Sequence, residues 1–189
     1  MINYGGKELA NAYRTVRGNT LQIARDIPES SYDFRPTPGA RSVSEVLRHL
    51  IYASTFYEDI HAVRRITTLQ GYDFGAIGRV AAEKEREPLD KNGIIAKLES
   101  EGERVAKWLE SMPNEFLNET YTDPMGKNPK TRLENLLSIK EHEMHHRGQL
   151  MVMERMIGVV PHLTRQREER NRAREERERV ATAGAAQPA

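Results

Sequence analysis

The sequence predicts an all-α fold, a four-helix bundle with a long crossover between its second and third helices. Apolar residues recur at helical spacing in four long segments, whereas alternating strand patterns are nearly absent. Capping residues, proline or glycine bound these segments. Four helices of such length can bury one shared core by packing side by side.

The first predicted helix covers residues 7–26 and ends before Pro28. The second begins after Ser42, because Ser42 and Glu45 form a capping-box pattern. Its apolar stripe runs to about residue 66. Each of the two helices therefore presents one apolar face to the core.

A long connection, residues 67–90, follows the second helix. It is rich in glycine and contains the charged run 83–87, followed by Pro88. Connections of this length are uncommon in compact domains. We expect it to cross the bundle or to carry a short helix around Ala81.

Asp90 is the expected N-cap of the third helix, residues 91–111, which ends before Pro113. The fourth helix covers residues 131–157, and Gly158 stops it. Thr131 and Glu134 supply its capping box (Thr131-Arg132-Leu133-Glu134).

The chain of 189 residues is expected to hold one domain, residues 1–163, and a charged tail, residues 164–189. Residues 165–179 contain seven arginines and five glutamates with almost no apolar face. We expect a solvated, partly helical tail with a disordered alanine-rich end. A helix that binds a partner or braces a dimer is the alternative.

Composition excludes several classes of function. The net charge of +1 gives no general reason to bind nucleic acid or an anionic membrane, and no apolar run approaches the roughly 20 residues of a membrane span. The absence of cysteine excludes disulfides, cysteine zinc sites and a cysteine nucleophile. We expect a cytoplasmic protein without nucleic-acid or membrane partners.

His142 and His146 are the main candidates for chemistry. They are four residues apart, so they share one face of the fourth helix, on the same stripe as Ile139 and Met153. Two neighbouring buried imidazoles need polar partners, and one metal ion can serve both. Core histidines that bond to carbonyl or carboxylate groups are the alternative.

A third ligand is required, and helical spacing leaves both His49 and His61 open. Gln149 lies near the inward stripe, where it can support a ligand or form an interhelical hydrogen bond. His145 points toward the flank and is a candidate for the surrounding pocket. We expect His162, beside Pro161, to lie in a surface loop.

Parts of this sequence also match the motifs of two other kinds of metal site. The sequence His142-Glu143-x-x-His146 matches a zinc-protease signature with Glu143 as general base, but its third ligand would have to come from Glu168 or Glu169 in the charged tail. A di-iron site would combine residues 58–61 with residues 143–146, and it needs further buried glutamates. Both are less favoured.

Three segments together resemble the DinB/YfiT-like superfamily of metalloenzymes. They are residues 36–45 followed by His49, residues 142–149, and residues 157–161, so the resemblance covers residues 1–163. One departure is Arg41, which stands where many members carry tryptophan.

The resemblance implies a four-helix bundle with a crossover and one divalent metal ion, such as zinc, nickel or iron, on His49, His142 and His146. It also implies a small-molecule substrate and either a transferase that uses a low-molecular-weight thiol or a hydrolase. A bundle whose metal has a structural or sensing role is the alternative. We also expect a homodimer.

Overall fold

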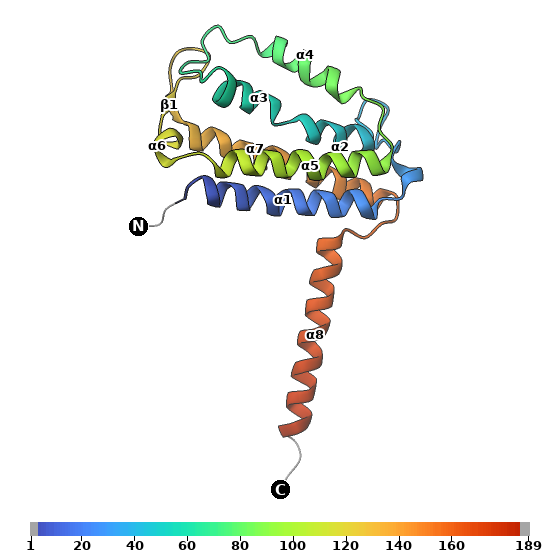
Figure 1. The fold of residues 1–189 in the computed structure, drawn as a ribbon. Helices are drawn as coiled ribbons and strands as arrows, with labels where there is room; N and C mark the ends of the chain where they lie inside the picture. Colours follow the sequence, from blue (N-terminus) through green and yellow to red (C-terminus); the bar gives the residue numbers. More distant parts are fainter. Residues whose placement is uncertain (1–3, 186–189) are drawn as a thin grey trace.

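The computed structural model describes residues 4–185 of the chain. Four long helices pack side by side in a bundle, which confirms the predicted fold class (Figure 1). They are α1 (Gly6–Asp26), α2 (Val43–Tyr52), α5 (Lys91–Glu110) and α7 (Arg132–Met156). Their starts follow the capping patterns, since Ser42, Asp90 and Thr131 each accept a hydrogen bond from the first turn of the helix that follows.

The second helix is shorter than predicted. It ends at Tyr52 and is followed by α3 (Thr55–Glu58) and a π-helical turn, Asp59–Val63. Arg132 of α7 anchors the end of this segment. It donates a hydrogen bond to the carbonyl oxygen of Ile66 and contacts the ring of His61. The wide turn buries both Ile60 and His61. The spacing of apolar residues in the sequence could not predict this change from α-helical to π-helical winding.

The crossover carries a helix, as the sequence allowed. This helix, α4 (Phe74–Glu85), lies over α2 and α3 in Figure 1 and packs against both. Asp73 caps it by accepting from the amide of Ala76. The connection between α5 and α7 contains α6 (Asn114–Leu117) and two short antiparallel strands, β1 (Thr120–Tyr121) and β2 (Lys130–Thr131).

Two large apolar clusters make most of the core, with a polar layer between them, and a smaller third cluster contains Ile60, Leu69 and Tyr121. One large cluster includes Leu47 and Leu150, and the other includes Leu109 and Ile139. Apolar burial of this kind stabilises the fold by roughly 25 cal/mol for each Å² removed from water. Along α1 and α7, the polar residues Arg17 and Glu143 separate the two clusters.

Arg17 and Glu143 form a buried ion pair with a separation of 2.8 Å between Nε and Oε1. Arg17 also donates to the carbonyl oxygens of Leu98 at 3.0 Å and Leu50 at 2.9 Å. A side chain at Gly102 would meet Arg17 Cγ at 2.8 Å, so the glycine permits this close approach. One arginine thereby connects α1, α2, α5 and α7.

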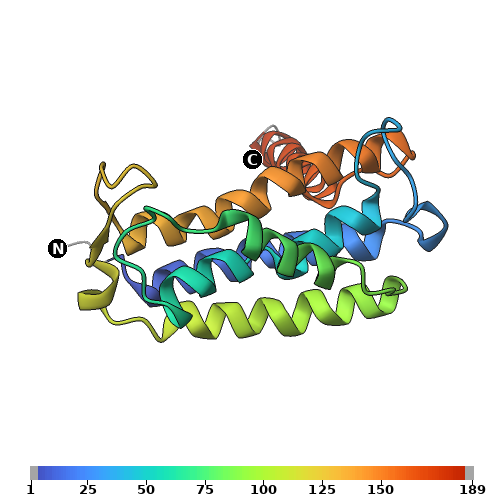
Figure 2. The same ribbon diagram turned by 90° about the horizontal axis from the view of Figure 1, so that it is seen from above.

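The C-terminal helix, α8 (His162–Ala185), projects away from the bundle (Figures 1 and 2). Residues 166–182 are exposed, as expected for so charged a segment. The prediction that His162 lies in a surface loop was wrong. His162 begins α8, is 4% exposed and contacts Asn19 of α1. The physical reason is that α8 starts directly after Pro161 and is anchored to α1 by Arg165 and Asp26, at 2.6 Å.

In the described part of the chain, no helix is both long and apolar enough to cross a membrane.

Candidate metal centre

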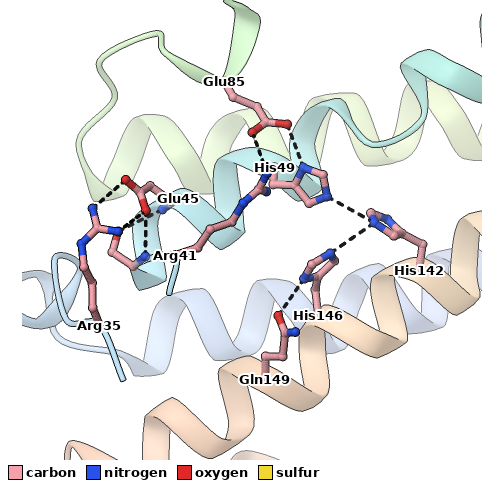
Figure 3. A network of polar contacts seen from close by, with 9 residues as sticks. Arg35, Arg41, Glu45, His49, Glu85, His142, His146 and Gln149 are labelled. Carbon is pink, nitrogen blue, oxygen red and sulfur yellow. Dashed lines mark hydrogen bonds and ion pairs between the residues drawn. The ribbon is translucent and has the colours of Figure 1, made fainter. Parts of the chain in front are cut away.

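Three histidines from two helices meet on one side of the bundle (Figure 3). His49 belongs to the last turn of α2, while His142 and His146 occupy successive turns of α7. The Nε2 atom of His142 lies 3.2 Å from Nε2 of His49 and 3.2 Å from Nε2 of His146. One ligand atom from each ring lies within 4.8 Å of the others.

Hydrogen bonds on the far side of two rings fix their tautomers. Nδ1 of His49 lies 2.7 Å from Oε1 of Glu85, and Nδ1 of His146 lies 2.8 Å from Oε1 of Gln149. Both oxygens are acceptors, so each Nδ1 carries the proton and each Nε2 presents a lone pair. His142 Nδ1 is buried without a hydrogen-bond partner among the described residues.

Burial and neighbouring positive groups hold the α7 imidazoles in their neutral form. Burial, followed by the charges of His146 and His49, lowers the pKa of His142 to about 4. Burial also lowers the pKa of His146, against the opposing effect of its bond to Gln149. Both rings are therefore neutral at pH 7, the form in which imidazole binds a metal ion.

The residues present fit a divalent ion. The Nε2 lone pairs of His49 and His146 both face Nε2 of His142, and a cation among the three nitrogens could bind to all of them. In a tetrahedral zinc site with Zn–N bonds of about 2.0–2.1 Å, neighbouring nitrogens are roughly 3.3 Å apart. The two separations of 3.2 Å agree with that spacing. Imidazole donors also suit nickel and iron.

Glu85, the last residue of α4, supports His49 and was not predicted from the sequence. Burial would raise the pKa of Glu85, but the hydrogen bond from His49 and the charge of Arg41 lower it below its usual value. The carboxylate is thus ionised when it accepts from the imidazole. A weak signal exists in the sequence, because Ile77, Ala81 and Glu85 recur every four residues and line one cavity.

His61, the other candidate third ligand, lies outside the cluster. Its Nε2 lies 2.7 Å from Oδ1 of Asn135 and its Nδ1 lies 3.1 Å from Nη1 of Arg132. Both ring nitrogens of the neutral imidazole are thereby satisfied within the protein. His61 has the environment of a structural core histidine.

The structure does not assemble either rival site. Glu143 is paired with Arg17 in the core, so it does not serve as a base for the histidines. Glu58 is paired with Arg104 at 2.7 Å, and Glu168 and Glu169 lie on the exposed part of α8. Both the protease and the di-iron arrangements lack their carboxylates.

The remaining predicted residues lie near the cluster. Gln149 is exposed and bonds to His146, as described above, through its side-chain oxygen. His145 is also exposed, and its Nε2 lies 3.1 Å from Nε2 of Gln149. A side chain at Gly148 would meet nothing within 4 Å, so no close helix contact explains that glycine.

Two cavities flank the histidines. The larger, about 420 Å³, has His146, Gln149 and Arg41 on its wall. The smaller, about 260 Å³, is lined by His49 and His142 together with aromatic side chains of α3 and α4. One cavity therefore reaches His146, and the other reaches His49 and His142.

Sequence comparison identifies the family. The profile of the DinB superfamily matches residues 12–150, well over half of the chain. The chain belongs to the DinB superfamily. A search of curated proteins found no match.

Several solved structures share the fold. YfiT from Bacillus subtilis, described as a probable metal-dependent hydrolase with an unusual four-helix bundle topology, has a TM-score of 0.63 and 18% identity, covering 82% of this chain and 89% of YfiT. The dinb-like protein yjoA from Bacillus subtilis has a TM-score of 0.58 and 18% identity over 81% and 94% of the two chains. A mycothiol-dependent maleylpyruvate isomerase has a TM-score of 0.58 and 11% identity over 78% and 61%. At these identities the likeness shows the fold alone.

Proposed function

We propose that this DinB protein is a metal-dependent enzyme that holds one divalent ion on His49, His142 and His146 and acts on a small molecule. The observation that carries the proposal is the convergence of three histidine Nε2 atoms beside two cavities. Three protein ligands leave a position for substrate, which is typical of catalytic rather than structural sites. A metal with a structural or sensing role would need no adjoining cavity.

Activation of a low-molecular-weight thiol is the favoured reaction. When bound, a divalent ion lowers the pKa of a thiol, making a thiolate nucleophile near neutral pH. The chain has no cysteine of its own, so the sulfur would come from the substrate. The thiol-dependent isomerase among the fold relatives is consistent with such chemistry.

Hydrolysis is the second candidate, and the carboxylates around the site disfavour it. Water activation commonly uses a free carboxylate or histidine as general base. Among the described residues that line the two cavities, Glu85 is the one carboxylate, and it is engaged by His49. Glu143 is held by Arg17. A thiol has a pKa of about 8.5, against about 15.7 for water, so it loses its proton more readily and makes smaller demands on these residues.

The chain's own residues have defined roles in this proposal. Glu85 and Gln149 orient two imidazoles so that their Nε2 atoms face the centre. The aromatic wall of the smaller cavity, which includes Phe56, Tyr57 and Phe74, excludes water from one side. The exposed larger cavity admits the second reactant.

A kinetic assay tests the proposal. Zinc-loaded protein is mixed with cysteine or glutathione and a chromogenic aryl halide, and in parallel with a nitrophenyl ester. We expect thiol transfer to exceed the uncatalysed rate at pH 6–7 and to be lost in His142→Ala. The matched variant His61→Ala removes a buried histidine away from the centre and should retain transfer.

Two outcomes would contradict the favoured reaction. Ester hydrolysis that depends on His142, without thiol transfer, would favour the hydrolase. The absence of both activities across metals and thiols, with one ion still bound, would favour a structural or sensing role.

A further inference from the structure

The wall of the larger cavity beside the metal centre carries a positively charged side chain and no acidic one among the described residues. Among the described residues on its wall, Arg41 is the one arginine, lysine, aspartate or glutamate. Glu85, the nearest acidic group to Arg41, lines the smaller cavity instead. Apolar side chains form the remaining walls (Pro36, Ala40, Val46, Val152 and Met153).

Arg41 is not fully engaged by the protein. Its Nη2 forms an ion pair with Oε2 of Glu85 at 3.6 Å, which is too long for a hydrogen bond, and its side chain is 46% exposed. Arg35, in the same loop, makes two hydrogen bonds to Glu45 at 2.5 and 2.6 Å and another to the carbonyl of Ala40. Arg35 therefore fixes the loop, whereas the one polar contact drawn for Arg41 in Figure 3 is its ion pair with Glu85.

We propose that Arg41 is a specificity-determining residue, which binds the carboxylate of a substrate whose apolar stem lies in the larger cavity. The planar guanidinium matches a carboxylate with two parallel hydrogen bonds. A cavity of about 420 Å³ suits a small organic acid. The inference rests on the proposed function, because His146 lines the same cavity and an acid held by Arg41 would direct its other end toward the centre.

The charge balance around the centre favours the same class of ligand. A divalent ion on three neutral imidazoles adds two positive charges, and Arg41 adds a third. Glu85 is the one carboxylate bonded to this group of residues, and it offsets only one of them. An anionic substrate compensates the remaining charge, whereas a cationic substrate is repelled.

The test compares an acid with its uncharged amide. Hexanoate and hexanamide are titrated by NMR into the chelator-treated and the zinc-loaded protein. We expect the chelator-treated wild type to bind hexanoate roughly tenfold or more tightly than hexanamide, as a charge-assisted pair provides. Arg41→Gln should remove this preference and Arg41→Lys should keep part of it.

Arg48→Gln is the matched control. Arg48 also lies close enough to Glu85 to lower the pKa of that carboxyl, yet it does not line the larger cavity. We expect this variant to keep the preference for hexanoate. A loss equal to that in Arg41→Gln would show a general effect of positive charge and would overturn the proposal.

The two proposals fail in different ways. Equal binding of acid and amide by the wild type, or a preference that survives Arg41→Gln, overturns the role of Arg41. A preference that appears only with zinc and persists in Arg41→Gln assigns the carboxylate to the metal, which likewise overturns that role. A wild type that binds no zinc contradicts the proposed function, while an Arg41-dependent preference in the chelator-treated protein would still stand.

Discussion

His142 and Glu143 are neighbours on α7, yet the side chain of Glu143 finds its polar partners within the protein and that of His142 does not. Glu143 meets Arg17, whose remaining donors are used by the backbone carbonyls of Leu98 and Leu50. His142 meets two other lone-pair nitrogens, and its own Nδ1 has no partner among the described residues. A satisfied buried cluster fixes structure, whereas a cluster left with unpaired acceptors is ready for a ligand.

The same contrast separates the two histidines that the sequence left open. His61 is buried and its pKa is lowered to about 4 by burial and by Arg132. The pKa of His142 is lowered to about 4 as well. A shifted pKa therefore does not distinguish a ligand from a core residue. The hydrogen-bond partners do, because Asn135 and Arg132 leave no free nitrogen on His61.

The largest expected effect comes from breaking the satisfied cluster. Arg17→Met leaves Glu143 charged and unpaired in the core, and we expect a loss of about 3–5 kcal/mol in the free energy of unfolding. Urea denaturation measures it. Arg14→Met, which removes a partly exposed arginine paired with Glu103 and Glu110, should cost less than about 1 kcal/mol.

A double variant separates the contribution of the Arg17–Glu143 ion pair from that of the other hydrogen bonds of Arg17. Arg17→Met with Glu143→Met removes both charges, so much of the lost stability should return. A double variant as unstable as Arg17→Met alone would mean that the carbonyl bonds of Arg17, rather than its pairing with Glu143, hold the helices together.

A smaller effect is expected at Glu154, which is buried on α7 with no partner for either carboxylate oxygen among the described residues. Burial and then Asp26 raise its pKa to about 7, against the opposing effects of Arg165 and Arg155. An acid with a raised pKa in the fold stabilises it at low pH, and this contribution is lost as the pH rises from about 4.5 through about 7.

Glu154→Gln should therefore be the more stable protein above pH 7, by roughly 3 kcal/mol, and should match the wild type below about pH 4.5. Unfolding free energies measured across this range would check it. A variant less stable than the wild type at pH 8 would show that the ionised carboxylate has a stabilising partner.

The smallest expected effect is a loss of zinc affinity when the carboxylate that orients His49 is changed. Glu85→Gln keeps an acceptor for His49 but removes its charge, and we expect zinc affinity to fall by roughly 10- to 100-fold. Competition with a chromogenic chelator measures the affinity. Glu87→Gln, in the same charged run but paired with Lys97 and Tyr52, should leave it unchanged. Equal losses in both variants would contradict a specific role for Glu85.

Local signals predicted most of the fold. Capping residues placed the starts of α2, α5 and α7, because a cap depends only on the residues of the first turn. The pair on α7 was also a local pattern, since four-residue spacing brings two histidines together on any helix. The break after Tyr52 and the burial of His162 depend on contacts with other helices, so periodicity did not reveal them.

The rest of the site comes from contacts between distant segments. His49 and His142 are 93 residues apart, and Arg17 and Glu143 are 126 residues apart. Periodicity could not choose His49 over His61, because both lie in the predicted second helix and only the packing of α2 on α7 separates them. The sequence did not single out Glu85, because it lies in the charged run 83–87, which resembles a solvent-exposed surface.

The most direct test of the central claim is the metal content of the purified protein after exposure to zinc and gel filtration. We expect one ion per chain in the wild type and in His61→Ala, and none in His142→Ala. A wild type without metal, or an ion that survives in His142→Ala but is lost in His61→Ala, would contradict it.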